Sequence, residues 1–304
     1  MTGVRVHVGP RPVPGLEAAV LAGGGALSSL AGAEAIVYYG NDDPEELAAM
    51  LHPGIRWVQL PHAGVEPWQR AGLITGTPTF SCSSGAYGEA VAEHTLALML
   101  AASRSLHKHA RASEWGPKNT RMFVGSTVAL IGAGGIGAHL MRMLVPFRCR
   151  ILAVARQPVV GADRTVAHDD YREVLSQADF VVVAAPYTVQ THHMISTREL
   201  GLMKDDAWLV NIARGPLVDT NALAEAVAAG MIGGAALDVT DPEPLPAGHP
   251  LWTLPNVLIT PHCANPDTEY WAGLTERTRA NVSAYNRTGG PFDLTGVVRP
   301  ELGY

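Results

Sequence analysis

Apolar positions along the chain gather in short runs, separated by helical stretches and by turns rich in proline and glycine. In the first hundred residues we predict a helix over 44–51 and strands over 4–8, 35–39, 57–60 and 79–81. This alternation is typical of a small α/β unit with a parallel sheet. A longer stretch with few breakers, residues 89–113, predicts a helix that leaves this unit.

A second alternating series begins at Thr127, and its strands are almost wholly apolar. The predicted strands are 127–131, 151–155, 180–184, 208–212, 235–238 and 257–259, followed by a helix over roughly 266–285. Near-continuous apolar strands are buried on both faces, as in a doubly wound parallel sheet. The short tail 292–304 cannot fold alone, so we expect it to return to the first unit and make that domain discontinuous.

Composition limits the classes of protein to which the chain can belong. A length of 304 residues is enough for about two domains with buried cores. A hydrophobic fraction of 47% with 16% charged residues indicates a folded globular protein and not a disordered one. The net charge of −6, without any run of Lys or Arg, argues against a nucleic-acid-binding surface.

Cysteine spacing and apolar stretches favour a cytoplasmic location. The three cysteines show no zinc-ligand spacing and cannot form a disulfide framework, so we expect free thiols and no metal site. The N-terminal residues lack a basic head followed by a long apolar stretch, so no signal peptide is expected. The alanine-rich stretch 16–39 is interrupted by three glycines and is too broken to span a bilayer.

The glycine-rich segment after the strand 127–131 predicts a dinucleotide-binding turn. Gly132 would allow the tight turn, Gly134 would let the backbone approach a pyrophosphate, and Gly137 would permit close packing of helix on strand. Between them, Gly135 and Ile136 begin the predicted helix, whose first N–H groups would face the phosphates.

The end of the next strand bears on the choice of cofactor. Sites for NAD usually have an acidic residue there that binds the ribose 2′-hydroxyl, and this chain has Ala155 followed by Arg156. Alanine leaves room and the arginine can meet a 2′-phosphate, so we favour NADP, with NAD possible.

Three further side chains follow successive predicted strands of the same sheet. Arg214 comes after the fourth, Glu243 lies in an Asp-Pro-Glu-Pro turn after the fifth, and His262 follows the sixth. Ligands in such sheets bind outside the carboxyl ends of the strands. A guanidinium can grip a carboxylate, and a carboxylate can favour a protonated imidazole. The adjacent pair His192 and His193 lacks a carboxylate neighbour in the sequence and serves as a decoy.

In order, the segments GAGGIG, VNIARGPLVD, ALDVTDPEPLP and LITPH resemble the D-isomer-specific 2-hydroxyacid dehydrogenases, over most of residues 58–285. The resemblance implies a Rossmann-type doubly wound parallel sheet plus a smaller flavodoxin-like α/β substrate domain, with the active site in the cleft between them. We assign residues 1–96 and 284–304 to the substrate domain and residues 97–283 to the dinucleotide-binding domain. Most members are dimers, so a homodimer is expected.

Matched residue by residue, the resemblance makes Arg214 the anchor of the substrate carboxylate and carbonyl. Glu243 becomes the partner of the catalytic imidazole, and His262 the proton donor. Asp238 falls where the family contacts the nicotinamide carboxamide, and Pro186 and Ala213 are also assigned to the cofactor site. The loop whose backbone N–H groups hold the substrate carboxylate is matched by Ala63, Gly64 and Val65.

The resulting hypothesis is an enzyme that reduces a small 2-oxo acid to the D-2-hydroxy acid with NADPH, in the manner of the glyoxylate/hydroxypyruvate reductases. One alternative is an NAD-linked dehydrogenase that works oxidatively on a phosphorylated or larger D-hydroxy acid. Another is a nucleotide-sensing protein of the corepressor kind, since corepressors of this fold retain the Arg, Glu and His. No nucleic acid or membrane partner is expected.

Overall fold

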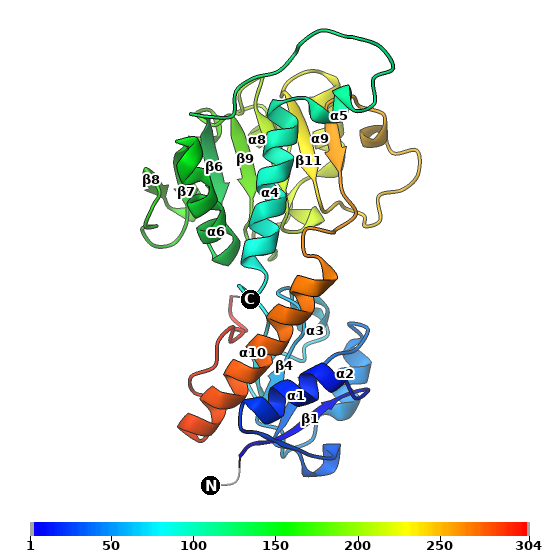
Figure 1. Ribbon diagram of the computed structural model, residues 1–304, viewed down its shortest axis with the longest axis vertical. Helices are drawn as coiled ribbons and strands as arrows, with labels where there is room; N and C mark the ends of the chain where they lie inside the picture. The colour runs from blue at the N-terminus through cyan, green and yellow to red at the C-terminus, as the bar shows by residue number, and fades with distance from the viewer. Residues whose placement is uncertain (1–2, 303–304) are drawn as a thin grey trace. The chain divides into compact units, whose positions relative to one another are not determined.

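The computed structural model describes residues 3–302, and the chain forms two compact units. The first unit takes the chain up to Tyr87 together with the part that begins at Asp267, and the second runs from Gly88 to Pro266. Each unit is built around one sheet in which every ladder is parallel (Figure 1). Two parallel-sheet α/β domains are the fold class that the sequence predicts, which is thereby confirmed.

The first unit holds a five-stranded sheet in the order β2-β1-β3-β4-β5. Its strands are β1 (Arg5–Gly9), β2 (Ala26–Leu27), β3 (Ala35–Tyr38), β4 (Trp57–Gln59) and β5 (Thr79–Ser81). Its helices are α1 (Pro14–Ala22), η1 (Leu30–Gly32), α2 (Pro44–Met50), α3 (Glu66–Arg70) and α10 (Asp267–Thr288). Strands β3 and β4 are fully buried because apolar clusters cover both faces of the sheet.

The last part of the chain packs within the first unit. Helix α10 lies along α1 (Figure 1). The Asn281 amide donates to Gln59 Oε1 at 2.8 Å inside the core. Beyond the helix, Val298 N–H donates to Phe80 O at 2.9 Å, and Val297 forms an isolated bridge with Ser81. These contacts add the tail to the edge of the sheet beside β5.

The second unit holds a seven-stranded sheet in the order β12-β11-β10-β9-β6-β7-β8. Its strands are β6 (Thr127–Ile131), β7 (Arg150–Val154), β8 (Arg164–Val166), β9 (Phe180–Val183), β10 (Trp208–Asn211), β11 (Gly234–Leu237) and β12 (Val257–Ile259). Strands β9, β10 and β11 are buried at every position, as their continuous apolar sequences require.

Helices cover both faces of this sheet. They are α4 (Gly88–Ser103), α5 (Leu106–His109), α6 (Gly135–Leu144), η2 (Val145–Phe147), η3 (His168–Asp170), α7 (Arg172–Leu175), α8 (Thr197–Leu200), η4 (Gly215–Leu217), α9 (Thr220–Ala228) and η5 (Pro250–Trp252). Helix α4 packs against α6 and against strands β10 and β11 (Figure 1). None of the helices within residues 3–302 is long and apolar enough to cross a lipid bilayer.

Some sequence-predicted elements differ from the structure. The helix predicted over 89–113 ends at Ser103, because Ser105 adopts a left-handed φ of +51° before the short helix α5. Strands β2 and β8 were not predicted, and β8 makes the strand before Arg214 the fifth of its unit. The compact units divide the chain after Tyr87 and after Pro266, whereas the predicted domain boundaries are at 96/97 and 283/284.

Candidate active site

The glycine turn follows strand β6 at the point where the strand order reverses. Gly132 has a φ of +96°, and a Cβ there would lie 2.7 Å from the backbone of Ala184 and Ala185, which follow β9. Strands β6 and β9 are neighbours at the switch point, where open α/β sheets bind ligands. Glycine is therefore required at 132 both by the backbone conformation and by the approach of the next loop.

Helix α6 begins directly after this turn, with Gly134 as its N-cap. Apart from the two chain neighbours of Gly134, no heavy atom of the described residues lies within 4 Å of a Cβ built on it, so there is open space in front of the helix. At Gly137 a Cβ would lie 3.0 Å from the Leu130 side chain, so α6 packs closely on β6. The first-turn N–H groups of Gly135 and Ile136 and the positive helix end fit a pyrophosphate placed in that space.

The other predicted cofactor positions follow neighbouring strands at the same edge of the sheet. Ala155 follows β7, its N–H donates to Val166 O at 3.1 Å, and Arg156 after it is exposed. Pro186 follows β9, and its carbonyl accepts a hydrogen bond of 2.9 Å from a threonine hydroxyl. Ala213 follows β10 and is buried. The residues proposed for phosphate, ribose and nicotinamide contacts thus come from adjacent strand ends.

Arg214 lies on the turn after β10 and is half-buried. The Asn211 amide donates to Arg214 O at 2.9 Å, and Arg214 Nη1 donates to Ala213 O at 2.7 Å. A Cβ at Gly215 would lie 1.8 Å from Thr240 O, a distance that only glycine avoids. The turn that carries Arg214 is therefore packed directly on the loop that leads to Glu243.

His262 and Glu243 form a short hydrogen bond between Nδ1 and Oε1, at 2.6 Å. Glu243 stands on the loop after β11 and His262 follows β12, so neighbouring strand ends bring them together. The two side chains are about half exposed, and Thr240 N–H donates to the other Glu243 oxygen at 3.4 Å. A bond this short between ionisable groups orients the ring and leaves Nε2 on its opposite side.

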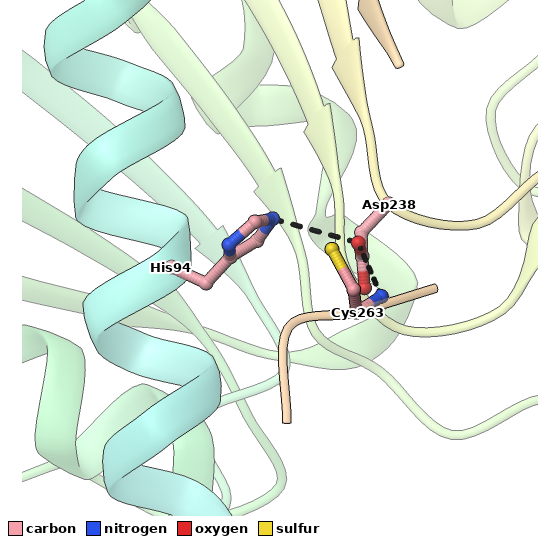
Figure 2. A group of neighbouring side chains, drawn as sticks. All are labelled: His94, Asp238 and Cys263. Atoms are coloured by element: carbon pink, nitrogen blue, oxygen red, sulfur yellow. Dashed lines mark hydrogen bonds and ion pairs between the residues drawn. The ribbon is translucent and has the colours of Figure 1, made fainter. Parts of the chain in front are cut away.

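Asp238 directly follows strand β11, and its carboxylate is buried. It accepts hydrogen bonds from the Thr260 hydroxyl at 2.6 Å and from the N–H groups of Cys263 and Ala264 at 3.0 and 3.1 Å. His94, on helix α4, points toward it, with Nε2 3.5 Å from Oδ1 (Figure 2). Burial raises the pKa of Asp238, but these hydrogen bonds outweigh burial and lower it to about 2.

His94 is the residue of this network that sequence analysis missed. It is one histidine in a long helix, and its partners lie far along the chain, so no local spacing marks it. The signal that could have found it is the polar side chain itself, placed in a helix whose neighbouring positions are mostly apolar.

The decoy pair is placed elsewhere. The rings of His192 and His193 stack at 3.9 Å, and His193 Nε2 lies 3.9 Å from an Asp241 oxygen. The pair lacks a carboxylate neighbour in the sequence, and in space the loop after β11 brings Asp241 near His193. A surface pocket of about 520 Å³ adjoins both histidines, and its lining includes neither the glycine turn nor His262 and Glu243.

The predicted substrate loop belongs to the first unit. Ser83 N–H donates to His62 O at 2.9 Å, immediately before Ala63 and Gly64. Val65 is buried in the core and caps helix α3, which anchors the far end of the loop. The His62 ring is held by Asp42 at 3.2 Å.

Comparisons with known proteins agree with this arrangement. Residues 96–264 match the family model for the NAD binding domain of the D-isomer specific 2-hydroxyacid dehydrogenases. The glyoxylate reductase of Pyrococcus furiosus is 36% identical over 239 residues, which are 73% of this chain and 69% of that protein. Glyoxylate/hydroxypyruvate reductase B of Yersinia pestis is 32% identical over 90% of this chain and 84% of its own.

A solved structure has the same fold. It is a D-isomer specific 2-hydroxyacid dehydrogenase from Xanthobacter autotrophicus Py2 in complex with NADPH and MES, with a TM-score of 0.85, 23% identity and full coverage of both chains. The family match covers more than half of this chain and includes the glycine turn, Arg214, Glu243 and His262. The chain therefore belongs to the D-isomer specific 2-hydroxyacid dehydrogenases, oxidoreductases that use a nicotinamide cofactor.

Proposed function

We propose that this protein reduces a small 2-oxo acid, such as glyoxylate or hydroxypyruvate, to the D-2-hydroxy acid with NADPH. The observation that carries the proposal is the 2.6 Å hydrogen bond between His262 and Glu243, on the same strand-end edge as the glycine turn. The nicotinamide, when bound, supplies the hydride that reduces the 2-oxo carbon. The relatives named above, which are glyoxylate and glyoxylate/hydroxypyruvate reductases, support this choice of substrate class.

His262 donates the proton in this proposal. With Nδ1 directed to Glu243, Nε2 is the ring atom that gives its proton to the keto oxygen. The hydrogen bond to Glu243 fixes the direction in which Nε2 points. Glu243 therefore acts on the substrate through His262.

Arg214 holds the acid. A guanidinium offers two parallel N–H donors that match a carboxylate, and its charge also draws electron density from the adjacent keto oxygen. The close contact of Gly215 with the loop leading to Glu243 fixes the turn on which Arg214 stands. The nicotinamide carboxamide is assigned to Asp238, with Pro186 and Ala213 beside it.

In this proposal the protein prefers NADPH to NADH, because of the two residues that follow β7. Arg156 is exposed where a 2′-phosphate would lie, and Ala155 offers no carboxylate for a 2′-hydroxyl. The KM for NADPH should be lower than that for NADH, by roughly tenfold or more if one charge-assisted hydrogen bond is at stake. Exchanging Ala155→Asp together with Arg156→Ala should reverse the order. Equal use of both cofactors by the unmodified protein would contradict the assignment.

One assay tests the function as a whole. NADPH and NADH oxidation is followed with glyoxylate, hydroxypyruvate and pyruvate, and NAD⁺ reduction is followed with phosphorylated D-2-hydroxy acids. Turnover of at least one small 2-oxo acid supports the proposal, and the D configuration of the product is checked by chiral chromatography. Turnover restricted to the phosphorylated acids, or binding of NADPH with no turnover at all, would refute it.

We further propose a homodimer, on the basis of the segment between α5 and β6. This segment forms a long loop in Figure 1 and exposes the large apolar side chains of Trp115 and Met122. An exposed tryptophan on an extended loop is typical of an interface residue. The protein should run as a dimer in light scattering, and Trp115→Ala should weaken dimerisation by about 2 kcal/mol or more, the usual effect at a central interface tryptophan. A monomer at all concentrations would exclude the dimer.

A further inference from the structure

The hydrogen bonds around Asp238 have one consistent assignment of protons. An ionised carboxylate has no proton to give, so the single hydroxyl hydrogen of Thr260 points to Asp238 Oδ1, 2.6 Å away. The Thr260 oxygen must therefore accept the hydrogen bond that joins it to His94 Nε2 at 3.0 Å. His94 thus carries its proton on Nε2 and donates it toward Thr260 and Asp238.

Asp238 contacts the turn after β12 at four points. Its carboxylate binds the Thr260 side chain and the N–H groups of Cys263 and Ala264, and its main-chain carbonyl accepts the His262 N–H at 2.8 Å. These contacts lie on both sides of His262 in the sequence. Asp238 therefore fixes the backbone of the turn that carries the imidazole.

His262 itself has a φ of +50°, in the left-handed region that residues other than glycine rarely adopt. Such a conformation persists only where the surrounding structure over-determines it. The direction of the imidazole toward Glu243 therefore depends on the contacts made by Asp238. A loosened turn would keep the ring but misplace its proton.

His94 links this turn to a different element of the unit. It projects from helix α4 (Figure 2). The hydrogen bond from its Nε2 holds the Thr260 hydroxyl in the orientation that serves Asp238. Removing one hydrogen-bond partner of a buried carboxylate destabilises the folded protein, and the neighbouring groups shift to compensate. Loss of the His94 donor would thus be transmitted to the turn through Thr260 and Asp238.

His94, Asp238 and Cys263 together have the composition of a metal site, but the hydrogen bonds to Asp238 and the protonated Cys263 thiol disfavour metal binding. A His94 nitrogen, an Asp238 oxygen and Cys263 Sγ lie within 4.8 Å of one another (Figure 2). A cation needs carboxylate lone pairs and a thiolate. Three hydrogen bonds already occupy the carboxylate, and burial together with the Asp238 charge raises the pKa of Cys263, which keeps the thiol protonated.

We propose that His94 is a positioning residue for the catalytic imidazole: through Thr260 and Asp238 it fixes the turn that aims His262. The proposal rests on the proposed role of His262 as proton donor. Helix α4 thus contributes to the reaction through His94, which acts on the turn and not on the substrate.

The test compares three replacements of His94. His94→Leu removes the donor, His94→Asn keeps an amide too short to reach Thr260, and His94→Gln places an amide N–H near the position of Nε2. Misplacement of a reacting group by about 1 Å can cost on the order of 10²-fold in rate, so kcat should fall roughly 10- to 100-fold in the Leu and Asn variants. The Gln variant should recover most of the loss.

Thr95→Val is the matched control. Thr95 is the next residue of α4, is fully buried and bonds only within the helix, to Val91 O at 2.6 Å, among the contacts described. Melting temperatures are measured for every variant, and kcat is measured well below the lowest of them. Imidazole NMR of ¹⁵N-histidine-labelled protein, with the His262 signal identified by its loss in His262→Ala, adds a readout that needs no turnover.

The expected result is a displaced His262 signal and a reduced kcat in the Leu and Asn variants, both restored by Gln and unaffected by Thr95→Val. An unchanged kcat in His94→Leu overturns the proposal, as does an equal loss in Thr95→Val. If the unmodified protein reduces no 2-oxo acid, the proposed function fails, and the NMR comparison alone then decides whether His94 orients His262.

Discussion

Replacing His262 by alanine is expected to lower kcat for 2-oxo acid reduction by about 10²- to 10⁴-fold, the usual contribution of a positioned general acid. Binding of NADPH should be largely unaffected, because the imidazole contacts Glu243 and not the glycine turn. Stopped-flow reduction and fluorescence titration of NADPH measure the two quantities separately. Both side chains are about half exposed, so the substitution should leave the fold intact.

The decoy histidines provide the control for this result. His192→Ala and His193→Ala remove imidazoles of similar exposure in the same unit, and neither should lower kcat comparably. A loss confined to the decoy variants would mean that the proton donor has been misassigned.

Glu243→Gln tests the same pair through the hydrogen bond that orients the ring. The amide keeps a hydrogen-bonding side chain of similar shape but removes the carboxylate that holds Nδ1 at 2.6 Å. The kcat for reduction should fall, by less than in His262→Ala, and the KM for NADPH should change little. A kcat equal to that of the unmodified protein would show that the 2.6 Å hydrogen bond has no part in proton donation.

Arg214→Lys is expected to raise the KM for 2-oxo acids by roughly 10- to 100-fold. Lysine keeps the charge but loses the planar pair of donors, and hydrogen bonds between charged groups contribute about 1.5–3 kcal/mol each. Steady-state kinetics over a series of substrate concentrations measure the change, and the KM for NADPH should remain close to that of the unmodified protein.

The matched control for this arginine is Arg172→Lys, which alters a guanidinium paired with Glu199 at 2.7 Å on the same unit. It should leave the KM for 2-oxo acids unchanged. If Arg214→Lys instead weakens NADPH binding and spares the substrate, Arg214 belongs to the cofactor site.

The strands of the second unit could be predicted because burial on both faces demands continuous apolar sequence. Strand β12 was predicted to the residue, and β9 and β10 to within one residue. Strand β8 was not predicted. It is a three-residue edge strand that begins with the exposed Arg164, so its sequence need not be apolar throughout. The helix 89–113 was overextended because the left-handed turn at Ser105 has no glycine or proline to announce it.

The candidate site was predictable as far as it consists of residues on the loops that follow strands. Parallel strands place their carboxyl ends on one edge, so sequence order alone brought together the glycine turn, Arg214, Glu243 and His262. The His94 contact is of another kind, because the position of a helix over the sheet decides which of its side chains faces Asp238. That position follows from packing and leaves no mark in the spacing of motifs.

The buried Asp238 carboxylate has a consequence for engineering the protein. Replacing a buried ionic network by well-packed apolar residues is often neutral or stabilising. Selection for heat resistance alone would therefore tend to remove Asp238 and His94, and the turn at His262 would relax toward an ordinary conformation. A variant in which apolar residues replace Asp238 and His94 would therefore be more stable to heat but would have a lower kcat. These two residues should be kept when the rest of the chain is redesigned.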